Sequence, residues 1–177
     1  MNQNKVSLII FSCLVCLFIK PSLVLAGVDK NLPLKDLNDT ITEGAFKGGQ
    51  AGDGFSLLNF TRVVSASKKS ERVIFEIGDK NGVSYSGKPG YFHAQLTKLP
   101  PEFTIDFSQM GFSKVDKKKF IQEFRKSKII KKIDLNIDNQ DNSTNLTIKF
   151  KKPLKVRVYT LSPSLKSPKI VVDFISI

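Results

Sequence analysis

The sequence predicts an all-β fold: a β-sandwich of two small sheets, built from an internally duplicated four-strand unit, with one short connecting helix. Apolar and polar residues alternate with a period of two over many short segments, which is typical of strands with one buried face. Turn signals such as Asn81-Gly82 separate these segments. Residues 83–107 and 155–174 read as divergent copies of one pattern, and two copies favour a pseudo-symmetric domain over a solenoid, which needs about three repeats.

The expected strands follow the chain in two matched sets. A turn at 87–90 interrupts only the first set, so we interpret it as an insertion, and loops on a rigid sheet often carry function. We expect this loop to be exposed and tipped with Tyr85, Tyr91, Phe92 and His93. The first unit comprises 57–65, 72–77, 83–86, 91–96 and a Pro-led segment at 100–107, and the second comprises 130–136, 146–150, 154–161 and 167–174.

The two Pro-led segments, PPEFTIDF and SPKIVVDF, both end in Asp-Phe. Their period of two places Phe107 and Phe174 on buried faces. Asp106 and Asp173 precede them at matching positions, which leaves two interpretations: a glycosidase-like carboxylate pair, or structural acceptors at strand ends. We expect the structural role, with hydrogen bonds from the backbone or from a basic side chain of a neighbouring strand. The candidates for that partner are Arg62, Arg72 and Arg157.

Between the two units, residues 113–127 favour a short helix. Phe120, Ile121 and Phe124 share one helical face, and Asp116 stands where a helix N-terminus prefers an acidic side chain. We expect this helix to connect the units.

The first 26 residues are typical of a secretory signal peptide. Lys5 precedes an apolar run at 6–19, and the residues up to Ala26 suit cleavage there. The run is shorter than the ~20 residues that span a bilayer, and we expect no transmembrane segment in the mature chain. Lipidation at Cys13 is the alternative, but Phe11 and the long apolar run beyond Cys13 disfavour a lipoprotein anchor. We therefore expect a periplasmic protein with a cleaved leader.

Residues 27–56 are polar and rich in glycine, so we expect a flexible segment ahead of a domain at 57–177. This segment lacks the Lys-Ser/Thr ending and the preceding strand of a phosphate-binding loop.

The composition excludes most catalytic chemistry. Both cysteines lie in the leader, so the mature chain has no disulfide framework or thiolate site, and His93 is its one histidine. Zinc hydrolysis and nucleophilic catalysis need several converging groups, so we expect His93 to be an ordinary strand residue. We predict no enzyme activity, no cofactor and no metal.

The mature chain is strongly basic. Without Lys5 and Lys20, 26 of the 28 basic residues remain against 16 acidic ones, a charge of +10. This favours polyanionic partners through a salt-screened field, although lysines also keep exposed strands soluble. For an exported protein we expect peptidoglycan or another envelope polyanion, and no nucleic acid.

The paired pattern resembles the AMIN domain of bacterial envelope proteins. The residues that carry the resemblance are 72–77 with 96–107, and 146–150 with 156–174. The resemblance implies a symmetric β-sandwich that targets or binds peptidoglycan in the periplasm, beside amidases or secretins. This chain has no room for either partner domain, so it is similar to a stand-alone module.

We therefore expect a non-catalytic binding or targeting module of the cell envelope. One alternative is an assembly protein that binds a pilus or secretion-system component by strand addition. Another is a carrier of lipid or lipopolysaccharide. The residues that we expect to contact a ligand are Lys88, Tyr91, Lys155, Arg157 and Tyr159.

Overall fold

The computed structural model describes residues 34–177 except 53, 68, 108–109, 111, 139, 141–142 and 163–165, and the side chains of residues 34 and 112. The predictions for the leader at 1–26, including Cys13 and cleavage near Ala26, lie outside the described residues.

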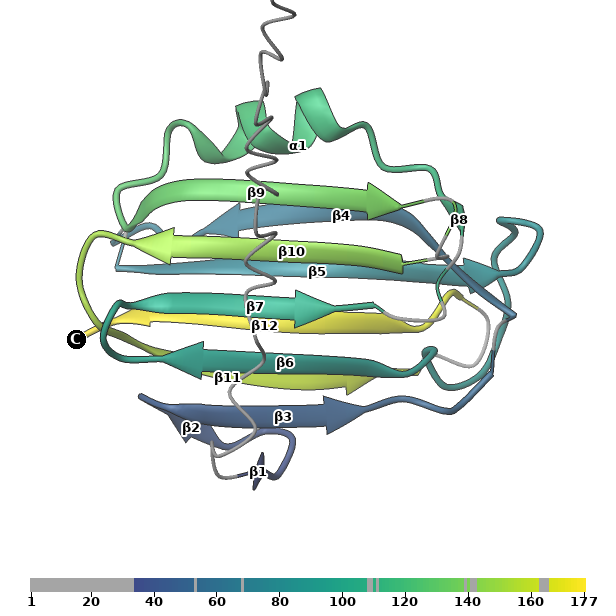
Figure 1. Cartoon of the computed structure of the whole chain (residues 1–177), viewed down its shortest axis with the longest axis horizontal. Helices are drawn as coiled ribbons and strands as arrows, with labels where there is room; N and C mark the ends of the chain where they lie inside the picture. Colours follow the sequence, from purple (N-terminus) through teal and green to yellow (C-terminus); the bar gives the residue numbers. More distant parts are fainter. Residues whose placement is uncertain are drawn as a thin grey trace, which may run out of the picture.

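Two sheets face each other and form a sandwich, as predicted (Figure 1). Sheet A has the order β1-β3-β6-β7-β10-β9, and sheet B has the order β2-β11-β12-β5-β4-β8. In each sheet five strands pair antiparallel, and one two-residue strand joins an edge in parallel: β1 beside β3, and β8 beside β4. The short strands are β1 (Leu34–Lys35), β2 (Thr40–Ile41), β3 (Gly44–Gly48) and β8 (Phe112–Ser113).

The predicted duplication appears in the topology. Each sheet takes one hairpin from each unit: β6-β7 of the first pairs with β10-β9 of the second, and β11-β12 of the second pairs with β5-β4 of the first. The first unit is β4 (Phe55–Val64), β5 (Ser70–Asp79), β6 (Phe92–Thr97) and β7 (Glu102–Asp106). The second is β9 (Ile130–Asp138), β10 (Ser143–Phe150), β11 (Leu154–Leu161) and β12 (Lys169–Ser176).

The register at the two unit junctions is also the same. Ile105 pairs with Leu146 in sheet A, and the matching Val172 pairs with Val73 in sheet B. A one-residue slip would turn every core side chain outwards, so the shared register follows from the shared apolar pattern.

Phenylalanine rings from both sheets fill the space between them. Phe107 and Phe174 have no exposed surface, as expected from their period of two. Phe107 of sheet A packs at 5.0 Å between centroids against Phe75 of sheet B, and Phe174 packs at 5.3 Å against Phe103. These edge-on contacts join the two layers.

Helix α1 (Lys117–Phe124) confirms the predicted connector. Asp116 caps it by accepting hydrogen bonds from the backbone N–H groups of Lys118 and Lys119. Its buried face carries Phe120 and Phe124. The helix lies above β9 and β4 at one side of the sandwich (Figure 1), where both rings contact Phe60 of β4.

The segment before the first unit differs from the flexible lead-in expected at 27–56. Its described part forms β1, β2 and β3 and begins β4, and Phe46 of β3 is completely buried. The glycines serve close packing. A Cβ on Gly49, whose φ is +84°, would lie 2.1 Å from the carbonyl oxygen of Gly90. The described part of the segment forms strands because it pairs with β6 in sheet A and with β11 in sheet B.

The loop between β5 and β6 also differs from expectation. Gly82 has φ +71° and donates to the Asp79 carbonyl, which confirms the turn, but no strand forms at 83–86. Tyr85 instead packs against Phe55, at 5.9 Å between ring centroids. Phe92 is completely buried in β6, so the loop is not the exposed aromatic tip that was predicted.

Candidate binding face on sheet B

The outer face of sheet B departs from its repeat copy in sheet A. The outer positions of the central strands can be compared row by row, because the two sheets share one register. Polar residues occupy the rows of sheet A, as expected for a sheet face turned to water. In sheet B the same rows hold apolar residues and arginines. The first row is Gln95-Thr104-Thr147 in sheet A and Tyr159-Val171-Ile74 in sheet B. The second row is His93-Asp106-Asn145 in sheet A and Arg157-Asp173-Arg72 in sheet B.

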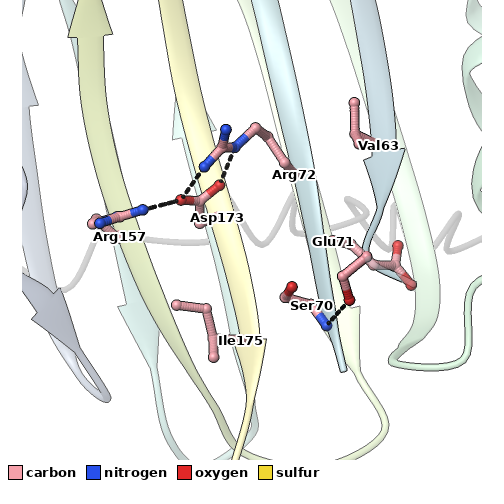
Figure 2. A pocket seen from close by; sticks show the side chains of 8 residues that line it. Val63, Ser70, Glu71, Arg72, Arg157, Asp173 and Ile175 are labelled. Carbon is pink, nitrogen blue, oxygen red and sulfur yellow. Dashed lines mark hydrogen bonds and ion pairs between the residues drawn. The ribbon is translucent and has the colours of Figure 1, made fainter. Parts of the chain in front are cut away.

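At the centre of this face, two arginines hold one carboxylate. Arg72 Nε lies 2.6 Å from Asp173 Oδ1, and Arg72 Nη2 lies 3.1 Å from Oδ2. Arg157 approaches from the other side, with Nη2 at 2.7 Å and Nε at 3.3 Å from Oδ2. Figure 2 shows both guanidinium groups converging on Asp173. The hydrogen bonds that we expected Asp173 to accept from basic side chains of neighbouring strands are therefore present, from Arg72 and Arg157.

The pKa of Asp173 reflects two opposing causes. Partial burial favours the neutral acid, but hydrogen bonds and charge from Arg72 and Arg157 together outweigh it and hold the pKa of the Asp173 carboxyl below its usual value. The hydrogen bond to Asp173 likewise raises the pKa of Arg72. The group therefore consists of two cations and one anion, with a net charge of +1.

Both arginines keep donors for another partner. The Nη1 group of neither arginine takes part in the four bonds to Asp173. The Arg72 and Arg157 side chains are 43% and 39% exposed, whereas Asp173 is 8% exposed. Tyr159 lies beside both guanidinium groups, with its ring centroid 5.7 Å from the Arg72 Cζ and 5.3 Å from the Arg157 Cζ. A ligand on this face would meet cationic donors before it meets the carboxylate.

A shallow hollow of about 370 Å³ adjoins the two arginines (Figure 2). Four neighbouring strands, β4, β5, β12 and β11, supply its walls. Val63, which is 49% exposed, and Ile175 contribute apolar surface beside the charged group. Its lining residues are Val63, Ser65, Ser70, Glu71, Arg72, Arg157, Asp173 and Ile175.

Glu71 has its own partners and belongs to a separate buried network. Its carboxylate accepts hydrogen bonds from Arg62 Nε at 2.9 Å and from Ser127 Oγ at 2.6 Å. Arg62 also donates to the Glu123 carbonyl, so the network fastens the end of α1 to sheet B. Arg62, one of the three partners proposed for the aspartates, therefore pairs with Glu71.

The structure brings together part of the predicted ligand set. Lys155, Arg157 and Tyr159 alternate on β11 with core residues, and so share the outer face. Lys155 is level with Ile175 and Ser70, at the start of β5. Lys88 and Tyr91 belong to the loop that leaves the opposite end of β5, at Asp79. They do not join the other three.

Arg72 was expected as a possible partner of Asp173, but the expected ligand residues include none from the part of this face that the first unit supplies. Arg72, Val63 and Ser70 lie on β5 and β4, and only the pairing of β5 with β12 brings them beside Asp173. One signal was available in the aligned repeats. The first unit has a cation, Arg72, at the position where the second unit has the neutral Asn145.

Within the described residues, no group of three or more His, Cys, Asp or Glu side chains could hold a metal ion. The same part of the chain contains no helix that is long and apolar enough to cross a membrane.

Comparisons with protein-family models, with curated proteins and with solved structures find no significant match. The resemblance to the AMIN family stays a prediction, and the function is argued from the fold and from this face.

Proposed function

We propose that the protein is a non-catalytic binding module of the cell envelope, and that the outer face of sheet B holds peptidoglycan or another anionic envelope polymer. The observation that carries the proposal is the contrast between the two copies. Where sheet A has Gln95 and His93, sheet B has Tyr159 and Arg157. Solubility alone gives no reason for Tyr159, Arg157 and Arg72 to stand where sheet A has Gln95, His93 and Asn145, whereas a binding surface does.

The chemistry of the face suits an anionic glycan with attached peptides. Guanidinium groups donate paired hydrogen bonds to carboxylates and phosphates. The ring of Tyr159 offers a flat apolar surface with a polar end. The charge of +10 on the exported chain adds long-range attraction that salt screens.

Co-sedimentation of the exported chain, residues 27–177, with purified peptidoglycan sacculi tests the proposal. We expect saturable binding that persists at moderate salt and with sacculi stripped of anionic polymers. Binding that disappears at moderate salt would reduce the interaction to net charge, and binding lost only after stripping would assign the face to the anionic polymer instead of peptidoglycan.

A matched pair of variants locates the binding face. Arg157→Ala with Tyr159→Ala should weaken binding about tenfold or more, as expected when a guanidinium and an aromatic contact are both lost. Lys149→Ala with Thr147→Ala removes a cation, paired at 3.2 Å with Glu102, from the outer face of sheet A. This control should bind like the wild type. Equal binding by a folded Arg157/Tyr159 variant would reject sheet B as the face.

Strand addition by a protein partner is the second candidate, because β9 is a nine-residue strand at the edge of sheet A. Helix α1 packs along β9, however, and Lys131 and Lys132 of this strand are exposed. Charged lysines on an edge oppose pairing with another chain. We therefore favour face binding, and co-purification of one stoichiometric partner at high salt would reverse that preference.

The lipid-carrier alternative requires an apolar cavity. The buried phenylalanines between the sheets, among them Phe103 and Phe174, occupy the space in which a lipid chain would lie. Bound lipid in mass spectra of the purified protein would favour a carrier.

A further inference from the structure

The hollow beside Arg72 has a composition that selects among anions. Arg72, Arg157 and Asp173 together carry a net charge of +1 and stand at one side of it. Glu71, which also lines the hollow, is neutralised by Arg62 at 2.8 Å. A ligand with one negative charge balances this group. A phosphate dianion carries one negative charge more than the +1 of this group can neutralise. It would also be repelled by the Asp173 carboxylate, which lies within hydrogen-bond distance of both arginines.

The rest of the hollow is suited to a small aliphatic group. Val63 on β4 and Ile175 on β12 flank Arg72 and Ser70 of β5, as Figure 2 shows. Val63 is 49% exposed and gains from contact with an apolar group. The hollow has a volume of about 370 Å³, which is near the lower end of the range for small-ligand pockets, ~300–1,000 Å³. A short ligand end fits better than a long polymer segment.

We propose that this hollow binds the free carboxylate end of a short peptide whose last residue has a small aliphatic side chain. The carboxylate accepts hydrogen bonds from the Nη1 groups of Arg72 and Arg157, and the aliphatic side chain contacts Val63 and Ile175. This inference rests on the proposed function, since the free ends of peptidoglycan stem peptides carry such a carboxylate on D-alanine. The occupant is therefore the stem peptide, while the glycan lies along Tyr159.

NMR titration of the exported chain with four probes tests the inference. The probes are N-acetyl-D-alanyl-D-alanine, its L,L stereoisomer, its C-terminal amide and inorganic phosphate. We expect saturable chemical-shift changes at Val63, Ser70, Arg72 and Ile175 with the D,D acid. The amide and phosphate should bind at least about tenfold more weakly. Equal shifts with the amide or with phosphate would overturn the carboxylate assignment. L,L binding as tight as or tighter than D,D binding would overturn the wall peptide as occupant.

Two variants separate the charge contribution from the apolar one. Arg72→Lys keeps the charge but loses the planar fork of donors, and should weaken D,D binding about tenfold. Val63→Ser, at an exposed position, should weaken it severalfold without unfolding the protein. Lys149→Gln on sheet A is the control and should leave binding unchanged. Binding of wild-type strength by the folded Arg72 and Val63 variants would reject the hollow.

The sacculus experiment distinguishes failure of this inference from failure of the proposed function. Sacculi that bind through Arg157 and Tyr159, with no shift from the D,D dipeptide, would overturn the inference and leave the function in place. Loss of both signals would overturn both.

Discussion

Arg72 and Asp173 join the two repeat units through a bidentate ion pair, with Nε and Oδ1 2.6 Å apart. Arg72 belongs to β5 of the first unit and Asp173 to β12 of the second, and the two residues are direct cross-strand partners. The pair therefore links the charge of the candidate binding face to the junction between the duplicated halves. Asp106, at the matching place in sheet A, has His93 and Asn145 as cross-strand partners instead of two arginines.

We predict that Asp173→Asn destabilises the protein. The change leaves Arg72 and Arg157 facing each other across a neutral side chain. Breaking a fully buried pair costs about 3–5 kcal/mol, but both arginines are roughly two-fifths exposed, which reduces the cost to about 1–3 kcal/mol. Urea unfolding followed by circular dichroism measures this change in the free energy of unfolding. Asp134→Asn, at a side chain that is 65% exposed, is the control and should change it little.

The same carboxyl predicts a pH dependence. Because the pKa of Asp173 is lower in the folded protein than in the unfolded chain, where it is about 3.9, its contribution to stability is present above that value. The contribution is lost as the pH falls through the folded pKa. Stability of the wild type should therefore fall more steeply below about pH 4 than that of Asp173→Asn. Parallel slopes in acid unfolding curves would contradict the assignment.

Tyr85 should ionise later than an ordinary tyrosine. Its burial against Phe55 raises the pKa of the phenol to about 12. Ultraviolet absorption of tyrosinate in the alkaline range should show a late-titrating contribution that Tyr85→Phe removes. Since the folded pKa exceeds the unfolded value of about 10, wild-type stability should fall as the pH rises through that interval. Tyr85→Phe, which has no phenol to ionise, should lack this loss.

We predict that Glu71→Ala is more damaging than Asp173→Asn. It leaves Arg62, whose side chain is 9% exposed, without the carboxylate that it contacts at 2.8 Å. It also removes the acceptor of the Ser127 hydroxyl, which holds the end of α1. Loss of a buried partner of this kind costs about 3–5 kcal/mol. Thermal unfolding measures the loss, and Arg62→Met combined with Glu71→Ala should restore part of it, because no unpaired charge then remains.

The candidate site was predictable only in part, and the reason lies in β11. The alternation of Val156 and Val158 with Arg157 and Tyr159 is local, so the shared face of this strand could be read from the sequence. The sequence could not show which arginine would contact Asp173, because Arg62, Arg72 and Arg157 all lie on expected strands and no local pattern distinguishes them. Pairing of β12 with both β5 and β11 selected two of them, and the orientation of β4 turned Arg62 towards Glu71.

The departures from expectation have the same origin. Residues 34–56 carry little periodicity, yet they form strands because β3 pairs with β6 and β2 with β11. Val83 and Tyr85 have strand-forming side chains, but residues 83–86 follow the turn at Gly82 into a loop. Its end pairs with Gln50, whose N–H donates to the Pro89 carbonyl. In both segments, contacts distant in the sequence outweigh local preference.

The sequence by itself determined the strands β4 to β7 and β9 to β12, the connecting helix, the duplication and the burial of Phe107 and Phe174, because period, capping and turn signals act over a few neighbouring residues. Only the tertiary structure decided which hairpin of each unit entered which sheet, and therefore which side chains gathered on the outer face of sheet B. Strand pairing is a contact between distant parts of the chain. It placed Arg72 and Val63 of one unit beside Asp173 and Ile175 of the other, which no local pattern encodes.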